Sequence, residues 1–125
     1  MHRGYQEGLA LAQAGEYFAA HEQLELAWRN CAEDERDFFQ GLVHVVVSAY
    51  QRNRARPVAA ERQRLKALRR LAAFVPTHRG LDVAALLAAL ERSEPDPREY
   101  LVERDLKPPV APEEQQQAER DEHGA

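Results

Sequence analysis

Hydrophobic residues recur at helical spacing through most of this 125-residue chain, and no stretch shows the alternation that is typical of strands. Glycine and proline are sparse before residue 94, so few positions interrupt a helix. The pattern predicts one all-α domain, a compact bundle of about five helices over residues 4–93. The expected helices cover about 4–14, 16–31, 35–54 and 57–74, and a fifth begins after Asp82.

Several residues at the predicted helix ends suit those positions. Gly15 is placed to end the first helix, because glycine readily adopts the left-handed conformation found there. Asp34 and Asp82 are expected to cap the third and fifth helices by accepting hydrogen bonds from free backbone N–H groups. Pro57 suits the first turn of the fourth helix. The third helix is apolar almost all round, which predicts a central position in the bundle.

Beyond Ser93 the chain becomes rich in proline and acidic residues. Residues 94–125 hold five of the seven prolines, with ten acidic and four basic side chains. We expect this segment to be a Pro-containing acidic tail that is partly disordered, because it has little apolar surface to bury. Within it, residues 98–106 are expected to form one docked turn through Tyr100, Leu101 and Leu106.

The composition argues against several classes of protein. The longest uncharged stretch, residues 38–51, is shorter than the roughly 20 apolar residues of a transmembrane helix. No apolar run follows the charged N-terminus, so a secretory signal is not expected. The single cysteine, Cys31, excludes an internal disulfide and a cysteine-based zinc site. We therefore expect a soluble, cytoplasmic domain with no membrane partner.

The second predicted helix has polar residues that its apolar stripe does not require. His21 lies near the middle of the stripe, Glu25 lies one turn later at its edge, and Glu22 is further round. A buried carboxylate is costly without a hydrogen bond or an opposite charge, so a partner is expected. The candidate polar cluster consists of His21, Glu22, Glu25, Trp28 and Gln40.

This cluster lies in a sequence pattern that resembles a known family. An aromatic–x–x–His–Glu–x–x–Glu–x–x–Trp helix precedes a helix with a Gln–Gly pair, and residues 8–90 are similar to the bacterial and archaeal family called domain of unknown function 309. The matching positions are Phe18, His21, Glu22, Glu25, Trp28, Gln40 and Gly41. The resemblance implies a small helical bundle and no agreed activity. The chain departs from the family at His44, where an aliphatic residue is more frequent, and in its acidic tail.

Two interpretations of the polar cluster remain open. In the preferred one, a hydrogen-bond network sets how two helices meet and organises a pocket or interface in a non-catalytic binding or interaction module without a cofactor. In the alternative, His21, Glu25 and His44 bind a divalent transition metal in a hydrolase-like enzyme. Glu22 is then the weak candidate for a catalytic general base. The chain lacks the His-Glu-x-x-His motif of zinc peptidases.

Two further residues have simpler explanations. Cys31 ends an apolar stripe, so it is expected to be a small core residue and not a nucleophile. Gly41 inside a helix costs about 1 kcal/mol relative to alanine. It is therefore expected to mark a close crossing with another helix, with Trp28 as the candidate neighbour.

Basic residues on the fourth helix raise a second alternative, nucleic-acid binding through the Arg52–Arg70 segment. This segment has eight basic residues and one acid. The basic strip on one helix face consists of Arg62, Lys66, Arg69 and Arg70. Nucleic acid is disfavoured as a partner, because no aromatic residue is interleaved with the strip and the chain has a net charge of −4. The acidic tail is a competing partner for the same cations, and a protein partner or a second copy of the chain stays open.

Overall fold

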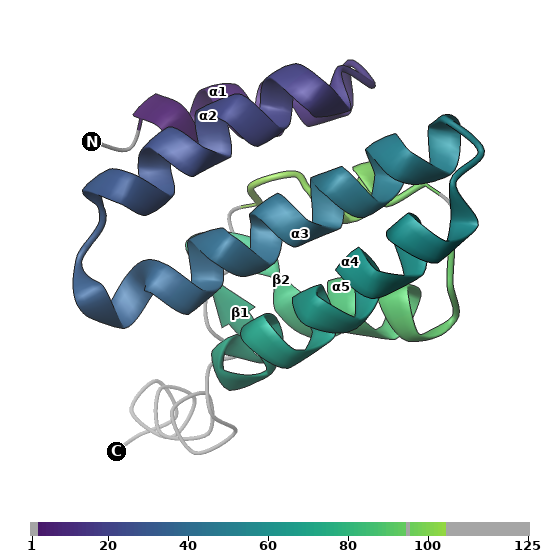
Figure 1. Ribbon diagram of the computed structural model, residues 1–125. Coiled ribbons are helices and arrows are strands. Elements are labelled where there is room, and N and C mark those ends of the chain that lie inside the picture. Colours follow the sequence, from purple (N-terminus) through teal and green to yellow (C-terminus); the bar gives the residue numbers. More distant parts are fainter. Residues whose placement is uncertain (1–2, 95, 105–125) are drawn as a thin grey trace, which may run out of the picture.

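The computed structural model describes residues 3–94 and 96–104, and within these residues the chain forms a bundle of five α-helices (Figure 1). The helices are α1 (Arg3–Gln13), α2 (Tyr17–Asn30), α3 (Arg36–Asn53), α4 (Pro57–Leu71) and α5 (Val83–Glu91). Three short 3-10 turns are η1 (Glu33–Glu35), η2 (Ala72–Phe74) and η3 (Arg98–Tyr100). The all-α class and the five helices expected from the sequence are confirmed.

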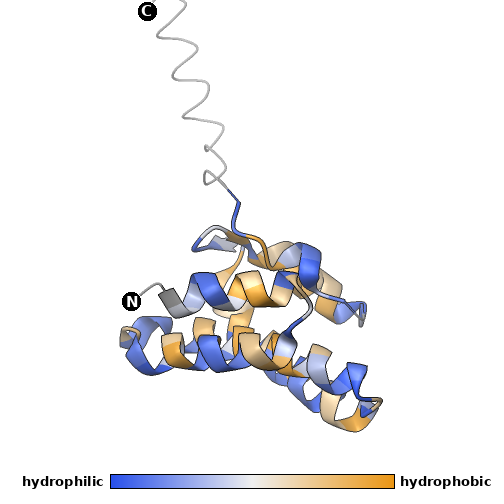
Figure 2. Ribbon diagram, turned by 90° about the horizontal axis from the view of Figure 1, so that it is seen from above, coloured by the Kyte–Doolittle hydropathy of each residue, from blue (hydrophilic) through white to orange (hydrophobic). Residues whose placement is uncertain are grey.

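Helix α3 lies between α2 and α4 and packs against both (Figure 1). Helix α1 packs along α2, and α5 packs against α4. Both hydrophobic and hydrophilic residues occur along the helices, as expected for amphipathic elements with one buried face (Figure 2). The buried residues of α3 are Phe38, Phe39, Gly41, Leu42, Val43, Val45, Val46, Ser48 and Ala49. The central position predicted for this helix is therefore confirmed.

The helix ends agree with the predicted caps at two of three positions. Gly15 has φ of +79° just after α1, and the Asp82 carboxylate accepts a hydrogen bond from Ala85 N at 2.9 Å at the start of α5. The cap predicted at Asp34 is wrong. Residue 34 is already inside the turn η1, whose backbone bonds from Glu35 N to Ala32 O and from Arg36 N to Glu33 O satisfy the donors that a side chain would have capped.

A two-stranded antiparallel hairpin, which the sequence pattern did not predict, joins η2 to α5. Strand β1 (Thr77–His78) pairs with β2 (Leu81–Asp82), with Thr77 opposite Asp82 and His78 opposite Leu81. The two residues between the strands, Arg79 and Gly80, both have positive φ, as in a type I′ turn. Strands of two residues are too short to show an alternating pattern, so periodicity does not reveal them.

The chain continues to pack on the bundle past residue 93, the end predicted for the helical domain. Leu101 is completely buried, and the Tyr17 hydroxyl donates a hydrogen bond to Asp96 Oδ1 at 2.7 Å. Burial and this hydrogen bond raise the pKa of Tyr17 to about 12. Gln13 Nε2 donates to the carbonyl of Arg98 at 2.6 Å. The docked turn expected through Tyr100 and Leu101 is present, whereas Leu106 and the rest of the tail lie outside the described residues.

Helices α3 and α4 approach closely where α3 has a glycine. A Cβ atom added at Gly41 would lie 2.6 Å from Leu71 Cγ and 2.7 Å from Leu71 Cδ2. Leu71 is completely buried, so it has little room to move away. The predicted close crossing is therefore present, but the neighbour of Gly41 is Leu71 of α4, and the expectation that it is Trp28 is wrong.

We expect Gly41→Ala to lower the free energy of unfolding by about 1–3 kcal/mol, because overpacking at Leu71 outweighs the better helix propensity of alanine. Urea denaturation followed by circular dichroism measures the change. In the double variant with Leu71→Ala the cost should be smaller than the sum of the two single changes, because the smaller side chain removes the clash. An unfolding free energy for Gly41→Ala equal to that of the wild type would contradict the close crossing.

Candidate functional site

The candidate site begins with three charged or titratable side chains spaced four residues apart on α2. His21 Nε2 lies 3.5 Å from Glu25 Oε1, and Glu25 Oε2 lies 3.7 Å from Arg29 Nη2. His21 Nδ1 lies 3.3 Å from the carbonyl oxygen of Phe18. Helical spacing thus brings His21 and Glu25 together, as the sequence predicted. All three side chains are partly or largely exposed, so these contacts hold the imidazole in place without forming a buried network.

A cavity of about 230 Å³ lies beside His21, between α2 and α3. Its lining residues are Phe18, His21, Val47, Tyr50 and Gln51. The Phe18 ring lies 5.4 Å from the His21 ring and 5.5 Å from the Tyr50 ring, both measured between centroids and both tilted. Although Phe18 forms one wall, it is 52% exposed. We call this space the α2–α3 cavity.

Gln51, which lines the α2–α3 cavity, also carries an unsatisfied polar atom. Its side-chain oxygen, Oε1, is buried and has no hydrogen-bond partner. A buried acceptor without a donor costs about 1–3 kcal/mol, so most such atoms in proteins are paired. Next to it, Arg54 Nη1 donates to the Tyr50 hydroxyl at 3.2 Å, and the Arg54 guanidinium lies 5.5 Å from the centre of the Tyr50 ring. The sequence reasoning missed Gln51 and Tyr50 as site residues, because neither belongs to a recognisable motif.

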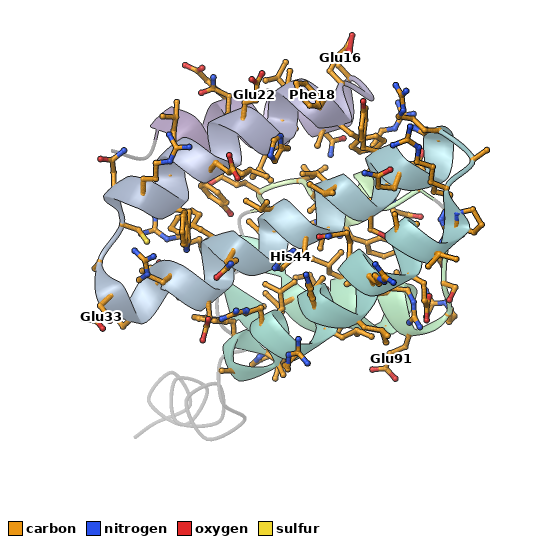
Figure 3. All side chains as sticks on the ribbon, in the orientation of Figure 1. Glu16, Phe18, Glu22, Glu33, His44 and Glu91 are labelled. Carbon is orange, nitrogen blue, oxygen red and sulfur yellow. The ribbon has the colours of Figure 1, made fainter. Side chains whose placement is uncertain are left out.

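The other predicted members of the polar cluster do not join His21 and Glu25. Glu22 is exposed and points away from the bundle (Figure 3). Trp28 lies under the Arg36 guanidinium, 4.4 Å from the ring centre, and its indole Nε1 is buried without a partner. In the described part of the chain, no hydrogen bond links Glu22, Trp28 or Gln40 to His21 or Glu25. The five residues therefore do not form one hydrogen-bonded network.

His44 is placed away from the other two candidate metal ligands, on the side of α3 that faces α4 (Figure 3). Its Nδ1 lies 2.7 Å from Gln63 Oε1. Burial lowers the pKa of His44, and the positive charges of Lys66, Arg70 and Arg69 lower it further, whereas Gln63 opposes the shift. Among residues 3–94 and 96–104, no three His, Cys, Asp or Glu side chains converge as metal ligands. The geometry thus brings together His21 and Glu25 but not the predicted three-ligand set.

Two further sequence candidates have clear surroundings. Cys31 is partly buried, its Sγ lies 3.1 Å from the Trp28 carbonyl oxygen, and burial raises the pKa of its thiol. These surroundings fit a packing role and not a reactive thiolate. In the basic strip, Arg62, Lys66 and Arg69 are exposed, whereas Arg70 forms an ion pair with Asp37 at 2.7 Å.

A second cluster of polar groups, which the sequence reasoning missed, lies at the N-terminal end of α3. The Glu35 carboxylate contacts His78 Nε2 at 2.7 Å and also accepts a hydrogen bond from Arg79 Nε. The His78 ring packs 4.6 Å from the Phe38 ring, and the Tyr5 hydroxyl donates to the Arg79 carbonyl at 2.8 Å. No sequence signal identifies this cluster, because more than 40 residues separate Glu35 from its partners.

The electrostatics of the Glu35 cluster are those of a satisfied ionic network. Desolvation raises the pKa of Glu35, but the hydrogen bonds from Arg79 and His78 outweigh it and the net pKa is lowered. The carboxylate is only 15% exposed, so its partners are screened little by water. Burial raises the pKa of the Tyr5 hydroxyl, which stays protonated as a donor. The cluster joins η1, the hairpin and α1, and every polar group described in it is paired.

Comparison with known proteins found a family match for the N-terminal half of the chain. The family model described as Domain of unknown function (DUF309) matches residues 5–63, just under half of the chain, from α1 into the first half of α4. The chain resembles this family over these residues, as its sequence pattern indicated, but the match ends at residue 63 and does not extend to residue 90 as expected. No curated protein and no solved structure matches the chain significantly. The matched segment contains both walls of the α2–α3 cavity and Glu35, whereas His78 and Arg79 lie beyond it.

None of the helices in the described residues is both long enough and apolar enough to cross a bilayer.

Because the folded-state pKa of Glu35 is lowered, its contribution to stability is present above the ordinary value of 4.5 and is lost as the pH falls through the folded-state value. We expect Glu35→Gln to lower the free energy of unfolding by about 2 kcal/mol at pH 7, because it removes charge-assisted hydrogen bonds. The difference from the wild type should shrink as the pH falls below 4.5. Urea titrations at several pH values measure it.

Glu33→Gln is the matched control for this prediction. Glu33 belongs to the same turn, but its side chain extends into solvent (Figure 3). Its replacement should change the unfolding free energy by less than about 0.5 kcal/mol at every pH. Equal effects of the two substitutions would contradict the assigned role of the Glu35 cluster.

Proposed function

We propose that this protein is a non-catalytic binding module that holds one apolar side chain of a protein partner in the α2–α3 cavity. The observation that carries the proposal is the combination of a small aromatic-walled cavity with a buried acceptor, Gln51 Oε1, that lacks a donor. A partner supplies apolar contact for the walls and, once the Gln51 side chain turns its buried oxygen toward the cavity, an N–H group for that acceptor.

The size of the cavity favours a single side chain over a larger ligand. Pockets for drug-sized molecules and cofactors usually enclose about 300–1,000 Å³. At about 230 Å³ the α2–α3 cavity is smaller than this range and suits one leucine- or phenylalanine-sized group. Binding sites of this kind, in which an aromatic or aliphatic anchor fills a pocket, supply most of the free energy of many protein interfaces.

The walls of the cavity favour a peptide-like occupant with both apolar and polar parts. Phe18 and Tyr50 offer ring faces, and Val47 adds an aliphatic surface. His21 and Gln51 present polar groups at the same cavity, so a backbone or side-chain amide next to the anchor has both donors and acceptors within the site. The contact between His21 and Glu25 fixes the orientation of the imidazole. His21 is thus a binding residue in this proposal and takes no part in turnover.

A binding role at the α2–α3 cavity also gives the unsatisfied Gln51 a purpose. A residue kept for binding often lowers the stability of the free protein. We therefore expect Gln51→Leu to leave the free energy of unfolding unchanged or to raise it by about 1 kcal/mol, because it removes the unpaired acceptor. The same substitution should weaken partner binding. Opposite effects on stability and binding distinguish a binding residue from a purely structural one.

The test uses a phage-displayed library of linear peptides, selected on the full-length protein and measured by fluorescence anisotropy. Selected peptides should share one apolar anchor, and Phe18→Ala, His21→Ala and Gln51→Leu should each weaken their binding by about tenfold, which corresponds to roughly 1.4 kcal/mol. His21→Ala should change the unfolding free energy by less than about 1 kcal/mol, since its ion pair is partly exposed.

Leu26→Ala is the matched control. Leu26 is an exposed aliphatic residue on the same helix, 44% accessible, but it does not line the cavity. Its replacement should change peptide affinity by less than twofold. Selected peptides that bind Phe18→Ala as tightly as the wild type would exclude the α2–α3 cavity as the binding site.

A further inference from the structure

The outer face of α4 combines exposed apolar residues with cations that have no partner among the described residues. Val58 is 66% exposed and Leu65, seven residues later on the same side of the helix, is 51% exposed. Arg62, Lys66 and Arg69 lie between and beside them and are also exposed. In the described residues none of these three cations has an ion pair or a side-chain hydrogen bond. We call this surface, Val58, Arg62, Leu65, Lys66 and Arg69, the α4 face.

The α4 face differs from an ordinary solvated helix surface. Elsewhere on the same helix the cations are paired: Arg64 contacts Glu61 at 2.6 Å and Arg70 contacts Asp37 at 2.7 Å. Arg62, Lys66 and Arg69 all lie within two turns of one another, so their positive charges reinforce each other. An occupant that suits this face is anionic and has some apolar side chains of its own.

The chain itself has such a segment immediately after the described residues. Residues 105–125 contain six acidic and two basic side chains, together with Leu106 and Val110. The residue before this segment is Arg104, whose N–H donates to the Gly80 carbonyl at 2.8 Å in the hairpin. The hairpin is next to the C-terminal end of α4, because the rings of Phe74 in η2 and His78 in β1 lie 4.8 Å apart.

We propose that the acidic segment 105–125 of the same chain binds the α4 face, with its carboxylates paired to Arg62, Lys66 and Arg69. The segment is long enough: residues 105–112 span up to roughly 26 Å when extended. The distance along α4 from Arg62 to Arg69 is only about 10 Å. Because the segment leaves the bundle at the hairpin, beside the C-terminal end of α4, this length is sufficient to bring the carboxylates of residues 113–122 to the α4 face.

The energetics of this docking rest on covalent attachment. A single exposed ion pair contributes about 0–1 kcal/mol, which is too little to hold two separate molecules together. A tethered segment has an effective concentration of roughly millimolar order, so several weak pairs suffice. The docking screens the α4 face from other polyanions, and it is independent of the peptide site proposed at the α2–α3 cavity, which lies between other helices.

Paramagnetic relaxation enhancement on the full chain tests the proposal. A nitroxide is attached at Ala118→Cys in a Cys31→Ser background, and amide peak intensities are compared with the diamagnetic form. At about 20 mM NaCl, where the Debye length is roughly 20 Å, the amide signals of residues 58–69 should lose at least half of their intensity. At about 0.5 M NaCl, where it is roughly 4 Å, they should recover.

Two full-length variants with the same change in charge separate docking on the α4 face from general attraction. The first variant should abolish the broadening of the amide signals of residues 58–69, and it combines Arg62→Glu, Lys66→Glu and Arg69→Glu. The matched control, Arg29→Glu with Arg36→Glu and Arg54→Glu, changes one cation on α2, one on α3 and one just after α3, and it should preserve the broadening. Broadening that persists in the first variant, or disappears equally in both, would overturn the proposal.

The remaining outcome concerns an external partner. If the wild-type chain shows no broadening of residues 58–69 at low salt, the segment does not dock and the proposal is overturned. A DNA duplex that then shifts the amide signals of the α4 face would identify the face as a site for an external polyanion. In that case the affinity should fall by about 0.9 logarithmic units per logarithmic unit of salt for each phosphate contacted.

Discussion

Burial of α3 on two opposite sides is the constraint on which the rest of the structure depends. A helix that is apolar almost all round must be covered by other elements, and in this chain α2 and α4 supply the cover. Gly41 lets α4 approach closely enough for Leu71 to pack directly on the α3 backbone. On the neighbouring surface Phe38 and Phe39 pack against the Tyr5 ring of α1, at 6.0 and 5.6 Å. Helices α1, α2 and α4 thus cover this central element, and α5 packs on α4.

The surroundings of α3 differ between its two ends. At the N-terminal end the Glu35 carboxylate is paired with both His78 and Arg79, and aromatic rings pack closely around them. At the C-terminal end a cavity remains beside Tyr50, and Gln51 Oε1 is buried without a donor. Local violations of good packing tend to occur where a protein binds something. Trp28 Nε1, near the N-terminal end, is also buried without a partner, but Trp28 lies under the Arg36 guanidinium and does not line the α2–α3 cavity. The binding site is therefore proposed where an aromatic-walled cavity and an unpaired acceptor belong to the same residues, and the paired carboxylate gives Glu35 a structural role.

At the candidate site, the sequence motif predicts contacts within one helix but not the residues that face it from another helix. Helical spacing brings His21 and Glu25 together, and the prediction needed nothing but their separation by four residues. The same spacing argument does not say what faces the pair from α3. The residues that face it are Val47, Tyr50 and Gln51, whereas Gln40 and His44 lie elsewhere on the same helix. A shift of a few residues along the helix therefore changes the chemistry that a site can perform.

The sequence by itself determined the helices, their approximate ends and the central position of α3, because these depend on periodicity and capping over a few residues. Gly15 and Asp82 acted as predicted for this reason, and Asp34 did not because a 3-10 turn used the same backbone groups. Only the tertiary structure decided that Leu71 faces Gly41, that Glu35 meets His78, and that Gln51 lacks a donor. These contacts depend on the rotation and crossing of packed helices, which short-range patterns along a chain do not encode.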